Sequence, residues 1–317
     1  MTTIDTSNQS NAGPATSGAS GASDAAHAPS VPDSIAAARR ALAEASADYL
    51  AVPDSTLEGP WTWHERELDV RYGVYRGAET IEAATAEIDG LVASQPARGL
   101  AARIISMSTI ARWALQGRLA SLDDTLLDLV PEDAEWTVRQ VLGHTIDGQR
   151  SYGWFTRWRL LLPPGTGPIT VPPEVEAASD AELPGEQADS LGTLAELRMR
   201  MDECLDEWAL RLGSTPDDQL ARPALWSNTP VDLAFRLNRW ASHIAEHTVQ
   251  LDKTLDWLGH HPTEVARVVR DLHTAWGRLE SRIFPSATSS PEIDAVLART
   301  AATLIADARS TRAAAER

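Results

Sequence analysis

From residue 34 to the C-terminus, apolar side chains recur at the three- and four-residue spacing of an α-helix. Ala, Leu, Arg and Glu dominate these segments, and all four favour helices. No stretch sustains the alternation of apolar and polar residues that marks a half-buried strand. The chain is therefore predicted to be all-α. We predict helices over residues 34–50, 63–92, 100–120, 138–162, 190–212, 230–258, 263–284 and 291–317.

The first 32 residues have a different composition from the rest. They are mostly Ser, Ala, Gly, Thr and Asn, with almost no large apolar side chain. Such a segment cannot bury enough surface to offset the entropy lost on ordering, so we predict a disordered tail. The helix pattern then divides the chain into a tail (1–32), an N-terminal helical extension (33–97), a four-helix bundle (98–262) and C-terminal helices (263–317).

Local signals mark the ends of the bundle helices. Thr137 followed by Gln140 matches a capping box, and Gly213 is a C-terminal cap signal. Thr229 before Pro230 matches an N-cap residue followed by proline at the first helical position. The second and third helices are separated by a proline-rich linker, residues 163–187. A linker of this length can cross a bundle from end to end, which would make its flanking helices parallel.

A loose duplication runs through the predicted bundle. The first helix is followed by an acidic loop at 122–124, a Trp, a Thr and a histidine-bearing helix. The third helix is followed by a similar loop at 216–218, Trp226, Thr229 and a second histidine-bearing helix. This order predicts two helical hairpins packed together.

Charge and cysteine content exclude several classes of protein. The formal net charge is -17, so the surface repels phosphate backbones and anionic lipids, and we expect neither nucleic acid nor membrane as a partner. No apolar run approaches the roughly 20 residues that span a bilayer, and the N-terminus lacks a secretory pattern. The single cysteine, Cys204, excludes an internal disulfide and is either a buried thiol or a reactive one. These features predict a cytoplasmic protein.

Three of the eight histidines form a candidate metal site. His243 and His247 are four residues apart, so both project from one face of the fourth bundle helix, about 5–6 Å apart. His144 lies at a matching place on the second bundle helix. Packing of the two helices would bring three imidazoles to one divalent metal and leave one coordination position open, as in catalytic sites.

Other interpretations of these residues stay open. The three histidines could be ordinary core residues of a bundle. Residues 243–247 (HIAEH) also match the H-x-x-E-H signature of inverted zinc peptidases, with Glu246 as the base and Glu264 or Glu280 as an acidic ligand. That interpretation leaves His144 unused. If the peptidase interpretation does not apply, Glu246 would face solvent or orient a ligand imidazole.

Two segments resemble the DinB/YfiT-like family: residues 136–144 (WTVRQVLGH) and residues 243–251 (HIAEHTVQL). The resemblance covers roughly residues 98–259. It implies a four-helix bundle with an up-down-down-up course, in which His144, His243 and His247 hold a divalent metal, commonly zinc or nickel. It also implies kinship with thiol-dependent S-transferases, which use a low-molecular-weight thiol such as mycothiol or bacillithiol.

The expected function is therefore a metal-dependent transferase or hydrolase acting on a small molecule, in which the metal activates a thiol or water. The alternative is a non-enzymatic metal-binding module for stress response or partner binding. The extra helices would cover the metal or form a homodimer contact. Further candidates for substrate binding, each of which could instead be solvent-facing or packed, are Arg150, Arg157, Arg159, Trp154, Trp158 and Trp240.

Overall fold

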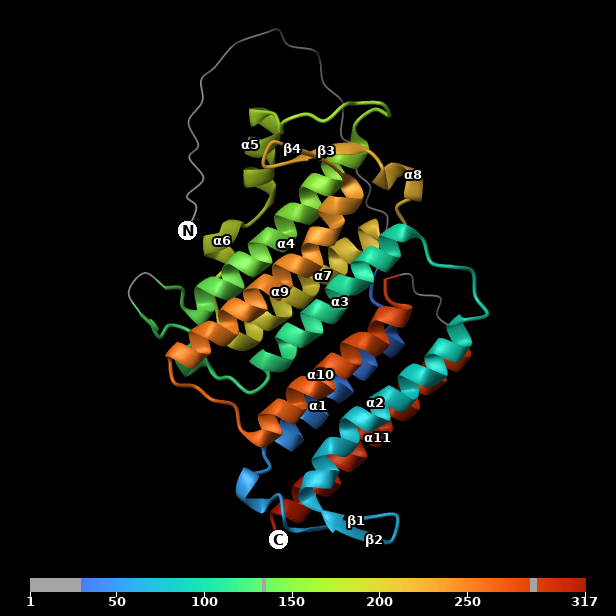
Figure 1. Cartoon of the computed structure of the whole chain (residues 1–317), viewed down its shortest axis with the longest axis vertical. Helices are drawn as coiled ribbons and strands as arrows, with labels where there is room; N and C mark the ends of the chain where they lie inside the picture. Colours follow the sequence, from blue (N-terminus) through green and yellow to red (C-terminus); the bar gives the residue numbers. More distant parts are fainter. Residues whose placement is uncertain (1–29, 133–134, 286–289) are drawn as a thin grey trace.

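The computed structural model describes residues 30–132, 135–285 and 290–317. Within these ranges the fold is all-α apart from two short β-hairpins, as predicted. Figure 1 shows two groups of four long helices stacked along the long axis. The predicted tail lies almost entirely outside the described residues. None of the helices described is long and apolar enough to cross a lipid bilayer.

The upper group in Figure 1 is the predicted bundle. Its helices are α3 (Leu100–Leu119), α4 (Val138–Leu161), α7 (Leu194–Leu212) and α9 (Leu233–Trp257). The first residue of α7 donates its backbone N–H to Asp124 just after α3, at 2.7 Å. Near the end of α9, Thr254 bonds the Trp136 carbonyl just before α4. Helices α3 and α9 therefore run one way and α4 and α7 the other, which is the predicted up-down-down-up course.

The lower group brings together the first and last long helices of the described residues. Its helices are α1 (Asp33–Leu50), α2 (Val70–Val92), α10 (Glu264–Ile283) and α11 (Pro291–Ala315). Helix α11 packs on both α1 and α2, and α10 packs on α2. Helix α10 also lies along α3 and joins the two groups. The shorter elements are η1 (Asp54–Thr56), η2 (Asp124–Leu126), α5 (Pro173–Glu182), α6 (Gly185–Asp189) and α8 (Asp217–Leu220).

Two predicted helix starts were wrong because β-hairpins precede the helices. Strands β1 (Pro60–Trp63) and β2 (Arg66–Asp69) pair before α2, and β3 (Pro223–Trp226) and β4 (Thr229–Asp232) pair before α9. Each hairpin turns through two residues with positive φ, the geometry of a tight two-residue turn. Thr229 and Pro230 are therefore strand residues. The cap of α9 is Asp232, whose carboxylate accepts the Phe235 N–H at 2.7 Å.

The other end signals had mixed outcomes. Thr137 and Gln140 form the predicted capping box of α4. Helix α7 begins later than predicted, because a second capping box, between Thr193 and Glu196, sets its start. Gly213 is the C-cap of α7, as predicted, although its φ of -63° is right-handed and not the left-handed conformation that favours glycine. The linker contains α5 and α6, which lie beside α4 in Figure 1.

One segment of the lower helix group has the same arrangement as one segment of the upper group. The segment α1–β1–β2–α2 has the same order and strand register as α7–β3–β4–α9, and each second helix is capped by an aspartate. In both copies an arginine lies over the tryptophan of the hairpin, at 4.4 Å in the first and 5.3 Å in the second. The duplication predicted from sequence paired different segments. The residues that correspond are Pro60 and Pro223, Trp63 and Trp226, Asp69 and Asp232, and Arg76 and Arg239.

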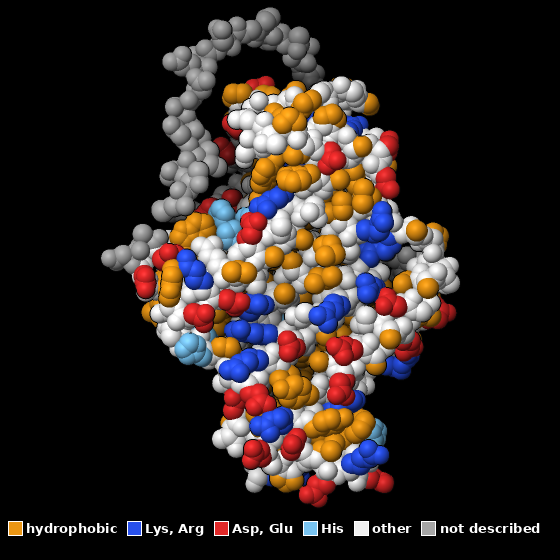
Figure 2. Space-filling model, viewed as in Figure 1, with side chains coloured by type: hydrophobic (Ala, Val, Ile, Leu, Met, Phe, Trp, Pro, Cys, Tyr) orange, Lys and Arg blue, Asp and Glu red, His pale blue; other side chains and the backbone are white. Residues whose placement is uncertain are grey.

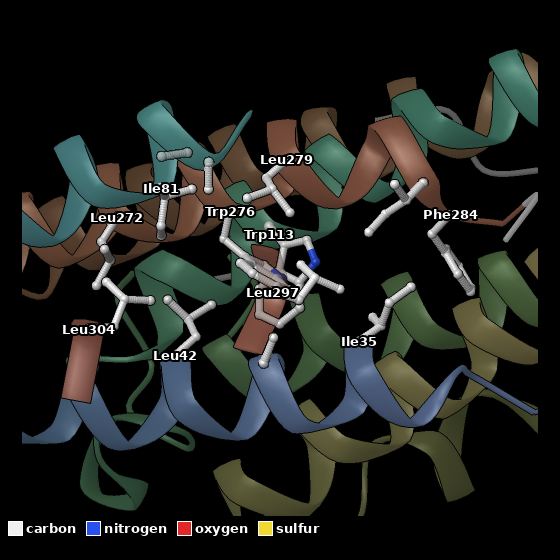
Figure 3. Packing of buried hydrophobic residues seen from close by; sticks show 14 of the residues in the cluster. Ile35, Leu42, Ile81, Trp113, Leu272, Trp276, Leu279, Phe284, Leu297 and Leu304 are labelled. Carbon is white, nitrogen blue, oxygen red and sulfur yellow. The ribbon is translucent and has the colours of Figure 1, made fainter. Parts of the chain in front are cut away.

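The core continues from one group into the other. Figure 3 shows Trp113 of α3 beside Trp276 of α10, with Leu42 of α1 close by. The two tryptophan rings meet edge to face at 6.3 Å. Burial of such large apolar side chains contributes about 1.5–3 kcal/mol each. On the outer face shown in Figure 2, acidic and basic side chains are interspersed.

Candidate metal centre

Three imidazoles meet where α4 and α9 pack together. His144 projects from α4, and His243 and His247 project from α9. Their ring centroids are 5.4 Å apart for His144 and His243, 4.8 Å for His144 and His247, and 4.4 Å for His243 and His247. One nitrogen from each ring lies within 4.8 Å of the other two. The arrangement is of a size to hold one metal ion.

Gly148 makes room for this convergence. It lies one helical turn after His144, facing His243 across the α4–α9 contact. A Cβ at position 148 would lie 2.6 Å from Cε1 of His243, which is closer than side chains approach. Glycine at this position therefore lets the buried imidazole lie against the α4 backbone.

A polar side chain contacts Nδ1 of each imidazole. Nδ1 of His247 donates to Oε1 of Gln250 at 2.8 Å, and Nδ1 of His144 donates to the Glu186 carboxylate at 3.1 Å. The Gln149 amide lies 3.0 Å from Nδ1 of His243, and its own Oε1 is buried without a partner. The Nε2–H of Gln149 donates to Nδ1 of His243, so the proton of this neutral imidazole is on Nε2.

These contacts decide which nitrogen is available to a metal. His144 and His247 have the proton on Nδ1 and present the lone pair of Nε2, whereas His243 has its proton on Nε2. The Nε2 atoms of His243 and His247 are 3.0 Å apart, and Nε2–H of His243 donates to Nε2 of His247. A metal ion bound here would take the place of that shared proton. The donor set therefore fits a divalent metal ion.

Burial keeps two of the rings neutral. It lowers the pKa of His243 to about 3, and the nearby His247 and His144 add to this effect. The pKa of His247 is also lowered, again chiefly by burial. Metal binding needs neutral imidazole, so proton competition at these two rings is weak near neutral pH. His144, by contrast, has a side chain 32% exposed, so solvent reaches the site from the His144 side.

The comparisons with known proteins place this segment in a family. Residues 109–251, which contain all three histidines, match the DinB superfamily. Residues 109–251 form a DinB superfamily domain. The domain resembles a solved structure described as YfiT from Bacillus subtilis, "a probable metal-dependent hydrolase with an unusual four-helix bundle topology", at 21% identity and a TM-score of 0.39. That match covers 50% of this chain and 87% of YfiT. No curated protein matches the chain.

Glu246 of the DinB domain does not bond an imidazole. Its carboxylate pairs with Arg239 at 2.8 and 3.1 Å, and this bond is the main reason why the pKa of Glu246 is lowered. The carboxylate that contacts a candidate ligand is Glu186 of α6, which sequence reasoning missed because it lies in the linker. The acidic ligands that the peptidase interpretation needs lie elsewhere: Glu264 pairs with Arg71, and Glu280 lies in the buried ion-pair network of α10.

Aromatic rings wall the site of the DinB domain. Trp136 stacks on His247 at 6.1 Å and meets His144 edge to face at 5.0 Å. Tyr152 meets His243 at 5.2 Å. Sequence reasoning had singled out other tryptophans for this role. Of these, Trp240 is fully buried, Trp154 packs on Phe155, and Trp158 lines a separate cavity.

The remaining candidates of the DinB domain lie away from the three histidines. Arg150 pairs with the buried Asp189, Arg157 is exposed, and Arg159 is buried among backbone carbonyls. Cys204 is buried, and burial raises the pKa of its thiol to about 12. It is therefore a protonated core residue, in keeping with the first of its two sequence interpretations.

Proposed function

We propose that this protein is a metal-dependent enzyme in which His144, His243 and His247 hold a divalent ion, zinc or nickel. The observation that carries the proposal is the convergence of the three rings: one nitrogen of each ring lies within 4.8 Å of the other two, and each Nδ1 contacts a polar side chain. A purely structural histidine cluster does not need a separate polar contact at the Nδ1 of each ring.

We further propose that the substrate is a small molecule and that a low-molecular-weight thiol, such as mycothiol or bacillithiol, takes part. A bound metal with an open position would lower the pKa of such a thiol or of water. Within the protein, Trp136 and Tyr152 limit the space beside the ring nitrogens, and Gln149, Gln250 and Glu186 hold the imidazoles in place. The side chain of His144 is partly exposed, so a small molecule can reach the proposed metal from that side. This access supports an open coordination position.

Elemental analysis of the purified protein tests the metal directly. We expect about one divalent ion per chain, lost in a His144→Ala variant that keeps its helical circular dichroism. Asp256→Ala, at an exposed position near the C-terminal end of α9, serves as a control that keeps the metal. Full metal content in His144→Ala would contradict the three-histidine site.

The catalytic part needs its own measurement. Thiol consumption with a panel of electrophiles, and hydrolysis of the same panel without thiol, are compared with and without a chelator. We expect turnover that the chelator abolishes. Metal binding without any turnover would instead favour a non-enzymatic metal-binding module.

A further inference from the structure

A cavity of about 200 Å³ lies in the upper helix group, on the far side of Tyr152 and Trp226 from the three histidines. It is bounded by the C-terminal half of α4, the β3–β4 hairpin, the start of α9 and the linker at residues 169–171. Apolar side chains, among them Phe155, Trp158 and Leu225, form much of its lining. Two arginines, Arg159 and Arg236, and one exposed carboxylate, Glu176, complete the charged lining, which is net positive.

Neither arginine of the cavity has an acidic partner among the described residues. Arg159 is 3% exposed and bonds only carbonyls, those of Pro223, Thr166 and Gly167, while its Nη1 is buried without a partner. Arg236 bonds the Leu225 carbonyl at 2.8 Å, and its Nε is buried without a partner. Burial lowers the pKa of both groups. A buried guanidinium without a carboxylate is costly, and an anion in the cavity would offset that cost.

The repeated unit in the same chain provides an internal comparison. At the positions of Ala224 and Arg236 the other copy has Trp61 and Gly73. Trp61 is buried, and a Cβ at Gly73 would lie 3.1 Å from its ring, so the corresponding space is filled.

The same copy also differs at the metal centre. Thr80 and Ala84 stand where α9 has His243 and His247. The cavity, Arg236 and the histidine pair of α9 are thus present together in one copy and replaced together in the other. This pairing links the cavity to the chemistry of the histidines.

The cavity and the metal centre are also close in space. The Tyr152 ring lies 5.2 Å from the His243 ring on one side and 5.4 Å from the Trp226 ring on the other. Cζ of Arg236 lies 5.9 Å from the same Trp226 ring. Tyr152 and Trp226 therefore connect the imidazole of His243 with Arg236 of the cavity through successive ring contacts.

We propose that this cavity binds the carboxylate end of a small organic acid with an apolar body, held by Arg236 beside Arg159. The proposal rests on the proposed function, because this acid would be the substrate class of the metal-dependent reaction. Charge-assisted hydrogen bonds from a guanidinium are among the strongest in proteins, so the carboxylate sets the affinity and the apolar lining accepts the body.

The test is calorimetric titration of the full-length protein with benzoate, a carboxylate on an apolar ring, and with neutral benzamide. We expect benzoate to bind and benzamide to bind at least about tenfold more weakly. Arg236→Gln is expected to weaken benzoate binding by about tenfold or more, whereas Arg299→Gln, an exposed control, leaves it unchanged. Ala224→Trp, which copies the tryptophan of the other unit, is expected to abolish binding without changing metal content.

The outcomes separate this proposal from the proposed function. Benzoate that binds Arg236→Gln and wild type equally, or fails to bind at concentrations on the order of 10 mM, overturns the anion site. If benzoate binding is lost in His247→Ala but kept in Arg236→Gln, the anion binds at the histidines. This result also overturns the anion site in the cavity. Benzoate binding by a protein that holds no metal supports the cavity and counts against the proposed function alone.

Discussion

Gly148 lies directly against the imidazole of His243, with space for a hydrogen atom but not for a methyl group. A Gly148→Ala substitution would place Cβ 2.6 Å from Cε1 of His243 and force that ring away from the other two. Because metal sites tolerate displacements of only about 0.5 Å, we expect metal affinity to fall by at least about tenfold. Competition with a chromophoric chelator measures this change.

Gly90→Ala is the matched control for that substitution. Gly90 also lies within a helix, and no atom is within 4 Å of its missing Cβ. Alanine there is expected to stabilise α2 by about 0.5–1 kcal/mol and leave metal affinity unchanged. Equal metal affinity in Gly148→Ala and wild type would show that metal binding does not depend on the present position of His243.

Gln149→Leu tests whether the contact at Nδ1 matters for metal binding. Leucine keeps the volume of the side chain but cannot form a hydrogen bond with Nδ1 of His243. Loss of such a partner commonly weakens metal binding by about 10–100-fold, and we expect a fall in that range with helical content retained. Gln219→Leu, on α8, is the control. An equal loss of metal affinity in Gln149→Leu and Gln219→Leu would argue against the proposal that Gln149 orients the imidazole of His243.

Glu280→Gln tests the ion pairs that join the helix groups. Glu280 is fully buried and accepts hydrogen bonds from Arg39 of α1 and Arg112 of α3, and both arginines also bond Asp206 of α7. Burial opposes the charged form of Glu280, but the two guanidinium groups outweigh it and lower its pKa. Removing this charge leaves two buried cations with too little compensation.

We therefore expect Glu280→Gln to lower the free energy of unfolding by about 3 kcal/mol. Urea unfolding followed by circular dichroism gives the value. Glu87→Gln, in the exposed pair with Arg299, should leave it nearly unchanged. A Glu280→Gln variant as stable as wild type would mean that the network contributes no net stability.

His273 should make stability depend on pH. It is fully buried, contacts Ser46 Oγ at 3.0 Å, and burial lowers its pKa to about 3. The unfolded chain binds a proton at this residue below its ordinary pKa of about 6.5, whereas the folded chain does so only near 3. The contribution of His273 to stability is thus complete above about pH 6.5 and is lost progressively as the pH falls towards 3.

Melting temperatures of wild type and His273→Phe between about pH 7 and pH 5 measure this effect. We expect the wild-type melting temperature to fall more steeply, because phenylalanine cannot take up a proton in the unfolded state. His261→Gln, at an exposed position after α9, is the control and should keep the wild-type slope. Parallel curves for wild type and His273→Phe would contradict the assignment.

The sequence by itself determined the helices and one face of the metal centre. Periodic apolar residues require a helix to bury its stripe, so the long helices and their bundle follow from local pattern. The i, i+4 spacing of His243 and His247 fixes their common face for the same reason, and Thr137 with Gln140 marks the start of α4.

Tertiary structure alone decided what completes the site. The position of His144 opposite the pair, the contacts of Gln149 and Glu186, and the room left by Gly148 all join elements distant in sequence. The hairpins before α2 and α9 were missed because their turns need positive φ at residues other than glycine, as at Ser227 and Asn228. Helical periodicity constrains each helix separately, whereas packing between helices sets the distances on which binding depends.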